Sequence, residues 1–135
     1  MRFVDTNVLL YAASTAPEEQ AKRARARAIL DDRDIALSVQ VLQEFYVQAT
    51  RETRPERITH EQAAALIDSW LRFRVEELSV ALLQNALSTR LRWGVSYWDA
   101  AVIEAARAAR CRTLLSEDLQ DGMDFGGVRV ENPFR

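Results

Sequence analysis

The sequence predicts an α/β fold in which helices flank a central, mostly parallel sheet. Three observations favour this class: short apolar runs alternate with longer segments of helical periodicity, capping residues precede those segments, and glycine or proline marks the breaks. Crossover connections between such strands build parallel sheets covered by helices. With 135 residues, no internal repeat and no long linker, we expect a single domain over residues 1–135.

The N-terminal half is expected to open with a buried strand. The polar residues Asp5-Thr6-Asn7 can cap a short helix after it, and Pro17 suits the first turn of a second helix. Ser38 can cap a third helix, whose apolar residues recur at helical spacing. The expected strands are Arg2–Val4 and Ile35–Leu37, and the expected helices are Val8–Ala12, Pro17 to about Leu30, and Val39 to about Thr50.

The C-terminal half repeats this alternation. Thr59 and Gln62 form a capping-box pattern, Gly94 ends a later helix, and Ser96 with Asp99 precedes another apolar run. The expected helices are Thr59–Trp70, Ala81–Trp93, and one from the Ser96–Asp99 pair to about Arg110. The expected strands are Val75–Val80, Thr113–Leu115 and Val128–Val130.

Composition is that of an ordinary globular protein, with 48% hydrophobic and 28% charged residues. No apolar run approaches the roughly 20 residues that a membrane helix needs, so no membrane association is expected. The single cysteine, Cys111, cannot form an internal disulfide, and it cannot build a zinc site with the single histidine, His60. The cytoplasm is therefore the expected compartment.

The formal net charge of -2 does not exclude a nucleic-acid partner, because the placement of charges matters more than their sum. Arginines cluster in the second predicted helix and between Arg51 and Arg57, and arginine suits phosphate contacts. For each cluster taken alone, a solvated helix face is the better interpretation.

Four carboxylates are predicted to gather at one edge of the sheet. Asp5 and Asp118 directly follow expected strands, whereas Glu44 and Asp99 lie near the starts of expected helices. Ligands of open parallel sheets bind beyond the carboxyl ends of the strands. Crowded carboxylates repel one another, a cation removes that cost, and oxygen ligands favour Mg²⁺ or Mn²⁺. Such a site can activate water for attack on a phosphodiester.

Structural roles for the same residues remain open from spacing alone. Asp5 could only cap the first helix, and Asp99 could only complete a capping box with Ser96. Glu44 could be a solvated side chain at a helix border, and Asp118 could belong to an ordinary acidic loop. His60 has no visible partner for base catalysis, Cys111 is interpreted as an inert buried thiol, and the tryptophans as core or interface residues.

Four segments resemble the motifs of PIN-domain proteins, especially the VapC-type toxins of prokaryotic toxin–antitoxin pairs. They occur in the order of the family's motifs and span nearly the whole chain. The first opens the chain, and the others surround Glu44, Asp99 and Asp118. The segments are Val4-Asp5-Thr6-Asn7-Val8-Leu9-Leu10-Tyr11, Ser38–Phe45, Ser96–Val102 and Leu114–Gly122.

The resemblance implies a PIN-like three-layer sandwich and a Mg²⁺- or Mn²⁺-dependent endoribonuclease toxin, a hydrolase that cleaves RNA. It also implies homodimerisation and inhibition by a cognate antitoxin. By motif position, the catalytic and metal-binding acids would be Asp5, Glu44, Asp99 and Asp118, with Asn7 and Ser116 as supporting polar groups. Glu117 or Asp121 could share or replace the role of Asp118 in the last turn.

Other functions fit the sequence less well. A response-regulator receiver needs adjacent acids after the first strand and a lysine after the last, but Lys22 lies in an early helix. A haloacid-dehalogenase-type phosphatase needs Asp-x-Asp where this chain has Asp5-Thr6-Asn7. The remaining alternative is a PIN-like module that binds RNA or protein without cleaving it.

Overall fold

The computed structural model describes residues 1–135 and contains a sheet of five short strands. All four pairings between neighbouring strands are parallel. The strands are β1 (Arg2–Val4), β2 (Ile35–Ser38), β3 (Arg74–Glu76), β4 (Thr113–Leu115) and β5 (Arg129–Glu131). The predicted α/β class with a parallel sheet is therefore confirmed.

The order of the strands across the sheet is β3-β2-β1-β4-β5. The chain moves outward from β1 through β2 to β3, and then returns to the other side of β1 to add β4 and β5. The order thus reverses between β1 and β4, which pair with Phe3 opposite Leu114. In open α/β sheets this reversal leaves a crevice at the carboxyl ends of the two strands, where ligands bind.

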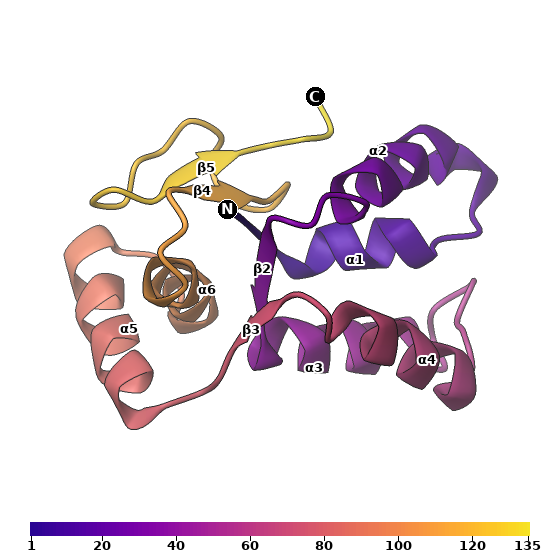
Figure 1. The fold of residues 1–135 in the computed structure, drawn as a ribbon, viewed down its shortest axis with the longest axis horizontal. Helices are drawn as coiled ribbons and strands as arrows, with labels where there is room; N and C mark the ends of the chain where they lie inside the picture. Colours follow the sequence, from indigo (N-terminus) through magenta and orange to yellow (C-terminus); the bar gives the residue numbers. More distant parts are fainter.

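Helices cover both faces of the sheet, which makes the three-layer sandwich (Figure 1). Helices α1 to α4 lie on one side, and α5 and α6 lie on the other, as right-handed crossovers require once the direction of strand addition reverses. They are α1 (Thr6–Ala13), α2 (Gln20–Leu30), α3 (Val39–Ala49), α4 (His60–Trp70), α5 (Val80–Trp93) and α6 (Tyr97–Ala108), with a 3-10 turn, η1, at Pro17–Glu19. None of them is long and apolar enough to cross a membrane.

Most predicted elements are present, with two notable differences. The third strand is confined to Arg74–Glu76, because its partner β2 ends at Ser38, which lies opposite Glu76, and the Ser79 hydroxyl then caps α5 from Val80. The predicted extended segment Val75–Val80 was therefore too long. The segment from Pro17 begins as the 3-10 turn η1, and α-helix follows only from Gln20. The predicted capping box of Thr59 and Gln62 is confirmed.

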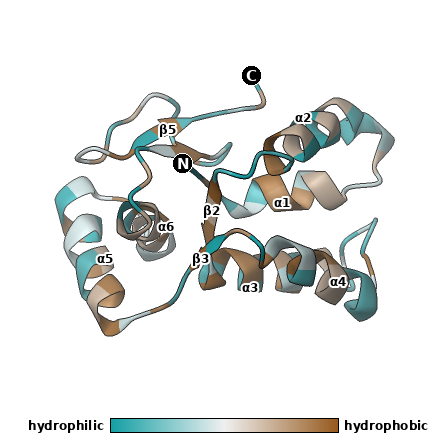
Figure 2. Ribbon diagram, viewed as in Figure 1, coloured by the Kyte–Doolittle hydropathy of each residue, from teal (hydrophilic) through white to brown (hydrophobic).

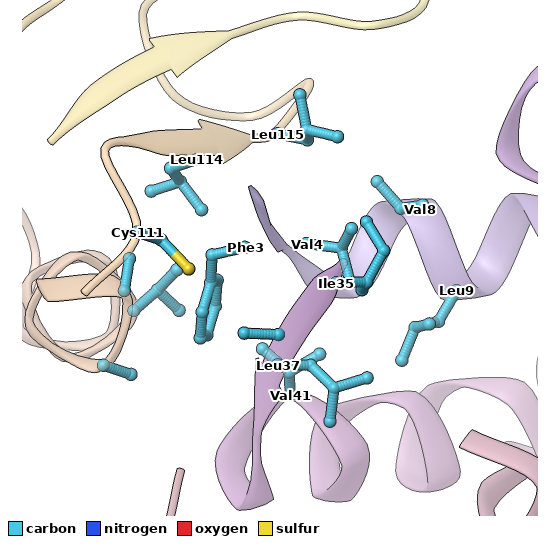
Figure 3. Close-up of a cluster of buried hydrophobic side chains, with 14 of the residues drawn as sticks. Phe3, Val4, Val8, Leu9, Ile35, Leu37, Val41, Cys111, Leu114 and Leu115 are labelled. Atoms are coloured by element: carbon cyan, nitrogen blue, oxygen red, sulfur yellow. The ribbon is translucent and has the colours of Figure 1, made fainter. Parts of the chain in front are cut away.

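The hydrophobic core lies on both faces of the sheet. Side chains from the strands meet apolar residues of α1 and α3, as Figure 3 shows for Val4, Leu9 and Val41. Hydrophobic residues accordingly concentrate on β2 and on α1, where the sheet and this helical layer meet (Figure 2). Cys111 belongs to this core, and burial raises the pKa of its thiol to about 11, which fits the predicted inert thiol.

A buried ion pair joins α5 and α6 to the loop before β5. The carboxylate of Glu104, on α6, is only 5% exposed and accepts hydrogen bonds from the Thr89 hydroxyl at 2.7 Å and from Arg107 Nε at 3.1 Å. Arg107 also donates to the backbone carbonyls of Phe125 and Gly126, each at 2.6 Å. The network satisfies a charge that would otherwise be costly inside the protein.

Loss of Arg107 should destabilise the fold measurably. We expect Arg107→Met to lower the free energy of unfolding by about 2 kcal/mol, because it leaves the buried Glu104 carboxylate without its charged donor. Urea denaturation measures the loss. The matched control is Arg112→Met, since the exposed Arg112 side chain makes no hydrogen bond or ion pair. Equal losses in the two variants would contradict a structural role for the ion pair.

Candidate active site

The four predicted acids line one small cavity at the carboxyl ends of β1 and β4. The cavity has a volume of about 90 Å³, room for a small ion and a few waters. Asp5, Glu44, Asp99 and Asp118 all contribute to its wall, together with Asn7. Thr6, Leu10, Gln48, Trp98 and Val102 complete the lining. Carboxylates far apart in the sequence thus share one hollow at the point where the strand order reverses.

Asp5 is the most deeply buried of these acids, at 7% exposure. Its Oδ1 accepts a hydrogen bond from the Thr6 amide at 2.7 Å, so it does cap α1 as the structural alternative suggested. Its Oδ2 accepts a second hydrogen bond from the Ser116 hydroxyl, also at 2.7 Å. Asp5 therefore caps α1 and also lines the cavity, so the two roles are compatible.

Burial dominates the electrostatics of Asp5. The pKa of its carboxyl is raised to about 6, mainly by desolvation and to a smaller extent by the nearby Asp118 and Glu44 carboxylates. The hydrogen bonds from Ser116 and Thr6 act in the opposite direction but only partly offset this effect. A cation bound to this carboxylate would favour its ionised form and offset the cost of burying the charge.

Glu44 is half-buried on α3 and is fixed from two sides. Its Oε2 accepts a hydrogen bond from the Thr6 hydroxyl at 2.9 Å, and its Oε1 accepts one from Gln40 Nε2 at 3.0 Å. Sequence analysis missed both partners. The spacing of four between Gln40 and Glu44 on one helix could have indicated the second contact.

Asp99 lies in the first turn of α6, as predicted. The Ser96 hydroxyl accepts a hydrogen bond from the Asp99 amide at 3.1 Å, but the Asp99 carboxylate does not return one, so only half of the predicted capping box is formed. That carboxylate accepts no hydrogen bond from any protein group and lines the cavity. Both of its oxygens are therefore available to a ligand.

The polar residues Asn7 and Ser116 connect the turn after β4 to α1. Asn7 Nδ2 donates to Asp118 Oδ2 at 3.3 Å, and Asn7 Oδ1 accepts from the Glu117 amide at 3.3 Å. The Ser116 oxygen accepts from the Asp118 amide at 3.2 Å while its hydroxyl donates to Asp5. These contacts place the Asp118 carboxylate at the cavity wall.

The two other acids of this turn are engaged elsewhere. The Glu117 carboxylate accepts hydrogen bonds from the Tyr11 hydroxyl and from Lys22 Nζ, the latter at 2.7 Å. Burial alone would raise the pKa of Glu117, but these two donors outweigh it and lower the pKa. Asp121 accepts from the Asn132 amide at 2.8 Å and pairs with Arg135 at 2.9 Å. Neither lines the acidic cavity.

His60 lies at the start of α4, as expected, but it does have a partner. Its Nδ1 is 2.8 Å from the Tyr46 hydroxyl, a contact that the sequence did not indicate. The residue does not line the acidic cavity. Its role is therefore local to the α3–α4 contact.

Replacing Asp5 by an isosteric neutral residue should stabilise the metal-free protein. The folded-state pKa of about 6 lies above the ordinary 3.8, so this carboxyl stabilises the fold fully below about pH 4, and the stabilisation is lost as the pH rises through 6. We therefore expect Asp5→Asn to raise the free energy of unfolding near neutral pH by up to about 3 kcal/mol, with the difference vanishing at acid pH.

Chemical denaturation across this pH range in the presence of a chelator measures the effect. The control is Asp118→Asn, since Asp118 is exposed and should change stability much less. A pH-independent difference between wild type and Asp5→Asn would show that desolvation of the charge is not its cause.

The comparisons with known proteins agree with this geometry. The family model for the PIN domain matches residues 2–120. No curated protein sequence resembles the chain closely enough to count as a relative. Solved structures do resemble it, at identities that establish the fold and no more.

Three of these structures cover nearly the whole chain. VapC20 of Mycobacterium tuberculosis, described as a toxin that cleaves the sarcin–ricin loop, superposes with a TM-score of 0.69 at 20% identity over 87% of this chain and 92% of its own. A toxin–antitoxin complex from Klebsiella pneumoniae gives 0.70 at 19% identity over 98% of both chains. VapBC2 of Rickettsia felis, bound to a DNA fragment from its promoter, gives 0.66 at 18% identity over 97% of both.

The predicted family is thus confirmed by a match over most of the sequence and by a parallel sheet with the strand order and cavity described above. On this evidence the chain belongs to the PIN domain family.

Proposed function

We propose that this protein is a Mg²⁺- or Mn²⁺-dependent endoribonuclease that acts as the toxin of a toxin–antitoxin pair. The observation that carries the proposal is the convergence of Asp5, Glu44, Asp99 and Asp118 on one cavity of a PIN domain. The similar structures support it, since they include a toxin that cleaves an RNA loop and several toxin–antitoxin complexes. An anionic site of this kind can hold the metal of a metal-dependent ribonuclease.

The chemistry of the cavity suits a hard divalent cation. All its charged groups are carboxylates, no histidine or cysteine is among them, and oxygen-only ligands favour Mg²⁺ or Mn²⁺. No three acidic side chains converge closely enough to hold one ion as they stand. Asp99 and Asp118 are the adjustable members, since Asp99 accepts no hydrogen bond and Asp118 accepts one long bond from Asn7.

We assign Asp5, Glu44 and Asp99 as the residues that would hold the ion, with Asp118 completing the site or orienting water. When bound, the ion would activate a water molecule and neutralise charge that builds on the phosphodiester. The protein's own contribution is positioning. Ser116 and the Thr6 amide fix Asp5, whereas the Thr6 hydroxyl and Gln40 fix Glu44. Asn7 orients Asp118.

Metal binding and RNA cleavage should depend on the same acids. We expect Asp5→Asn and Asp99→Asn to weaken Mn²⁺ binding severely in calorimetry and to abolish cleavage of RNA, because each removes a charged oxygen ligand. Cleavage by the wild-type protein should stop in EDTA and should leave a 5′-phosphate and a 3′-hydroxyl. Glu117→Gln is the matched control, since its carboxylate faces Lys22 and Tyr11 outside the cavity.

Two results would contradict this proposal. Unchanged Mn²⁺ affinity in both Asn variants would remove the shared site. Products that carry a 2′,3′-cyclic phosphate and form equally well in EDTA would mean that the metal takes no part in the chemistry. RNA binding with no cleavage under any metal would instead favour a PIN-like binding module.

A protein partner is the second part of the proposal. Helix α5 exposes a stripe of apolar side chains at helical spacing, with Leu91 as much as 85% exposed. Exposed apolar stripes of this kind mark protein contacts. The stripe consists of Val80, Leu83, Leu87 and Leu91. By contrast, Trp70 at the end of α4 is buried in the core, one of the two places expected for the tryptophans.

We propose that the α5 stripe is the homodimer face, which leaves the antitoxin to bind elsewhere on the toxin. Light scattering at micromolar concentration should then give a dimer for the wild type and a monomer for the double variant Leu83→Glu/Leu91→Glu, since charged groups cannot be buried unpaired in an apolar interface. The control is Leu71→Glu, because Leu71 is equally apolar and exposed but follows α4. A wild-type monomer would refute the assignment.

A further inference from the structure

An open cleft of about 510 Å³ adjoins the acidic cavity and has no assigned role. It is bounded by α3 and by the start of α6, and it shares Glu44 and Trp98 with the acidic cavity, as well as Gln48. The other lining residues are Gln40, Gln43, Val47 and Arg51. The two hollows thus adjoin each other at these three residues, so one chain-like ligand can reach both.

The most conspicuous group in this cleft is the indole of Trp98. It is 62% exposed, although the other large aromatic side chains of the protein are mostly buried or half-buried. Its ring packs edge-to-face against Tyr97, with centroids 5.2 Å apart, and Tyr97 in turn packs against the core. The indole is therefore held in place by its neighbour while much of its surface remains open to solvent.

The polar groups around Trp98 fall into two classes. Gln40 is buried and occupied, since its Nε2 donates to Glu44 Oε1 at 3.0 Å and to the Trp98 carbonyl at 3.3 Å. The side chains of Gln43 and Gln48 make no hydrogen bond within the protein. Their carboxamides each offer both donors and an acceptor, which are the groups that read the edges of nucleobases.

Arg51 supplies an unpaired positive charge at the same cleft. Its guanidinium forms neither an ion pair nor a hydrogen bond in the structure, although the protein carries more acidic than basic residues. A free arginine beside a cavity of four carboxylates gives a phosphate chain a favourable approach that the acids alone would oppose.

We propose that this cleft is a subsite for one unpaired nucleobase of the RNA, stacked on Trp98, with Gln43 and Gln48 against its edge and Arg51 against a neighbouring phosphate. The proposal rests on the ribonuclease function proposed above and specifies its substrate as single-stranded at this position. Aromatic stacking needs an unstacked base, which a regular duplex does not offer. A protein contact would favour a continuous apolar surface, whereas most residues lining this cleft are polar.

The test compares RNA binding by Trp98 variants. Fluorescence anisotropy with labelled oligouridylate and oligoadenylate, and with an RNA duplex, reports affinity without requiring hydrolysis. We expect Trp98→Ala to weaken binding to the single strands about tenfold or more, a change that corresponds to about 1.4 kcal/mol. Trp98→Phe should retain most of the wild-type affinity because its ring still offers a stacking face, whereas Trp98→Leu should lose as much affinity as Trp98→Ala. Leu71→Ala, after α4, is the control outside both the cleft and the α5 stripe.

Tryptophan emission gives a readout that a merely structural role would not move. Trp98 is the most exposed of the three tryptophans, so single-stranded RNA should quench wild-type emission. Trp98→Phe should lose that quenching while it keeps most of the affinity. Persistence of the same quenching in Trp98→Phe would assign the signal to Trp70 or Trp93 and would overturn the stacking.

The remaining outcomes separate this inference from the ribonuclease function. Trp98-dependent binding by a wild-type protein that cleaves no RNA would uphold the subsite and refute the hydrolysis. Wild-type kcat/KM and affinity in Trp98→Ala would refute the subsite and leave the hydrolysis standing. A change of oligomeric state in Trp98→Ala with unchanged RNA affinity would assign the cleft to a protein partner and overturn the proposal, as would failure of the wild type to bind RNA.

Discussion

The hydrogen bond between the Ser116 hydroxyl and the buried Asp5 carboxylate joins the two strands at which the order of the sheet reverses. Asp5 follows β1 and caps α1, whereas Ser116 follows β4 and its oxygen accepts a hydrogen bond from the Asp118 amide. One short contact therefore sets the distance between the first and the last acidic motif. The other acids take their places relative to it, since Glu44 reaches the same corner through Thr6.

This arrangement trades stability for function. Burying Asp5 near two further carboxylates raises its pKa and makes its ionised form costly near neutral pH. For the stability of the fold alone, a neutral capping residue would be more favourable at this position than a buried aspartate. A cation that completes the cluster would account for both the raised pKa of Asp5 and the Asp99 oxygens that accept no hydrogen bond. Perturbed pKa values of this kind are common at functional sites.

The other acidic side chains of the turn after β4 are engaged by groups outside the cavity. Lys22 and Tyr11 hold Glu117 on the far side of the turn, and Arg135 holds Asp121. On the opposite side, the cleft with Trp98 leaves Gln43, Gln48 and Arg51 without partners. The acids on one side of the cavity are thus paired within the protein, whereas Arg51 along the cleft is unpaired. The cleft is the approach that we propose for the RNA.

The sequence by itself determined the local structure and the identity of the acids. Apolar runs, capping residues and Gly94 placed the helices and most strands, because these signals act within one turn or one strand. The length of β3 was misjudged, since β3 ends where its pairing with β2 ends, and that pairing is not a local signal.

Only the tertiary structure decided how those pieces meet. The strand order brings residues more than 100 positions apart, such as Asn7 and Asp118, into hydrogen-bond contact, and no local pattern encodes that pairing. It also decided that Asp118, rather than Glu117 or Asp121, faces the cavity, because each of the other two finds a cation elsewhere. The exposure of Trp98 was likewise undecided in the sequence, from which the tryptophans were interpreted as core or interface residues. Burial depends on which neighbours the fold supplies, and those neighbours come from distant parts of the chain.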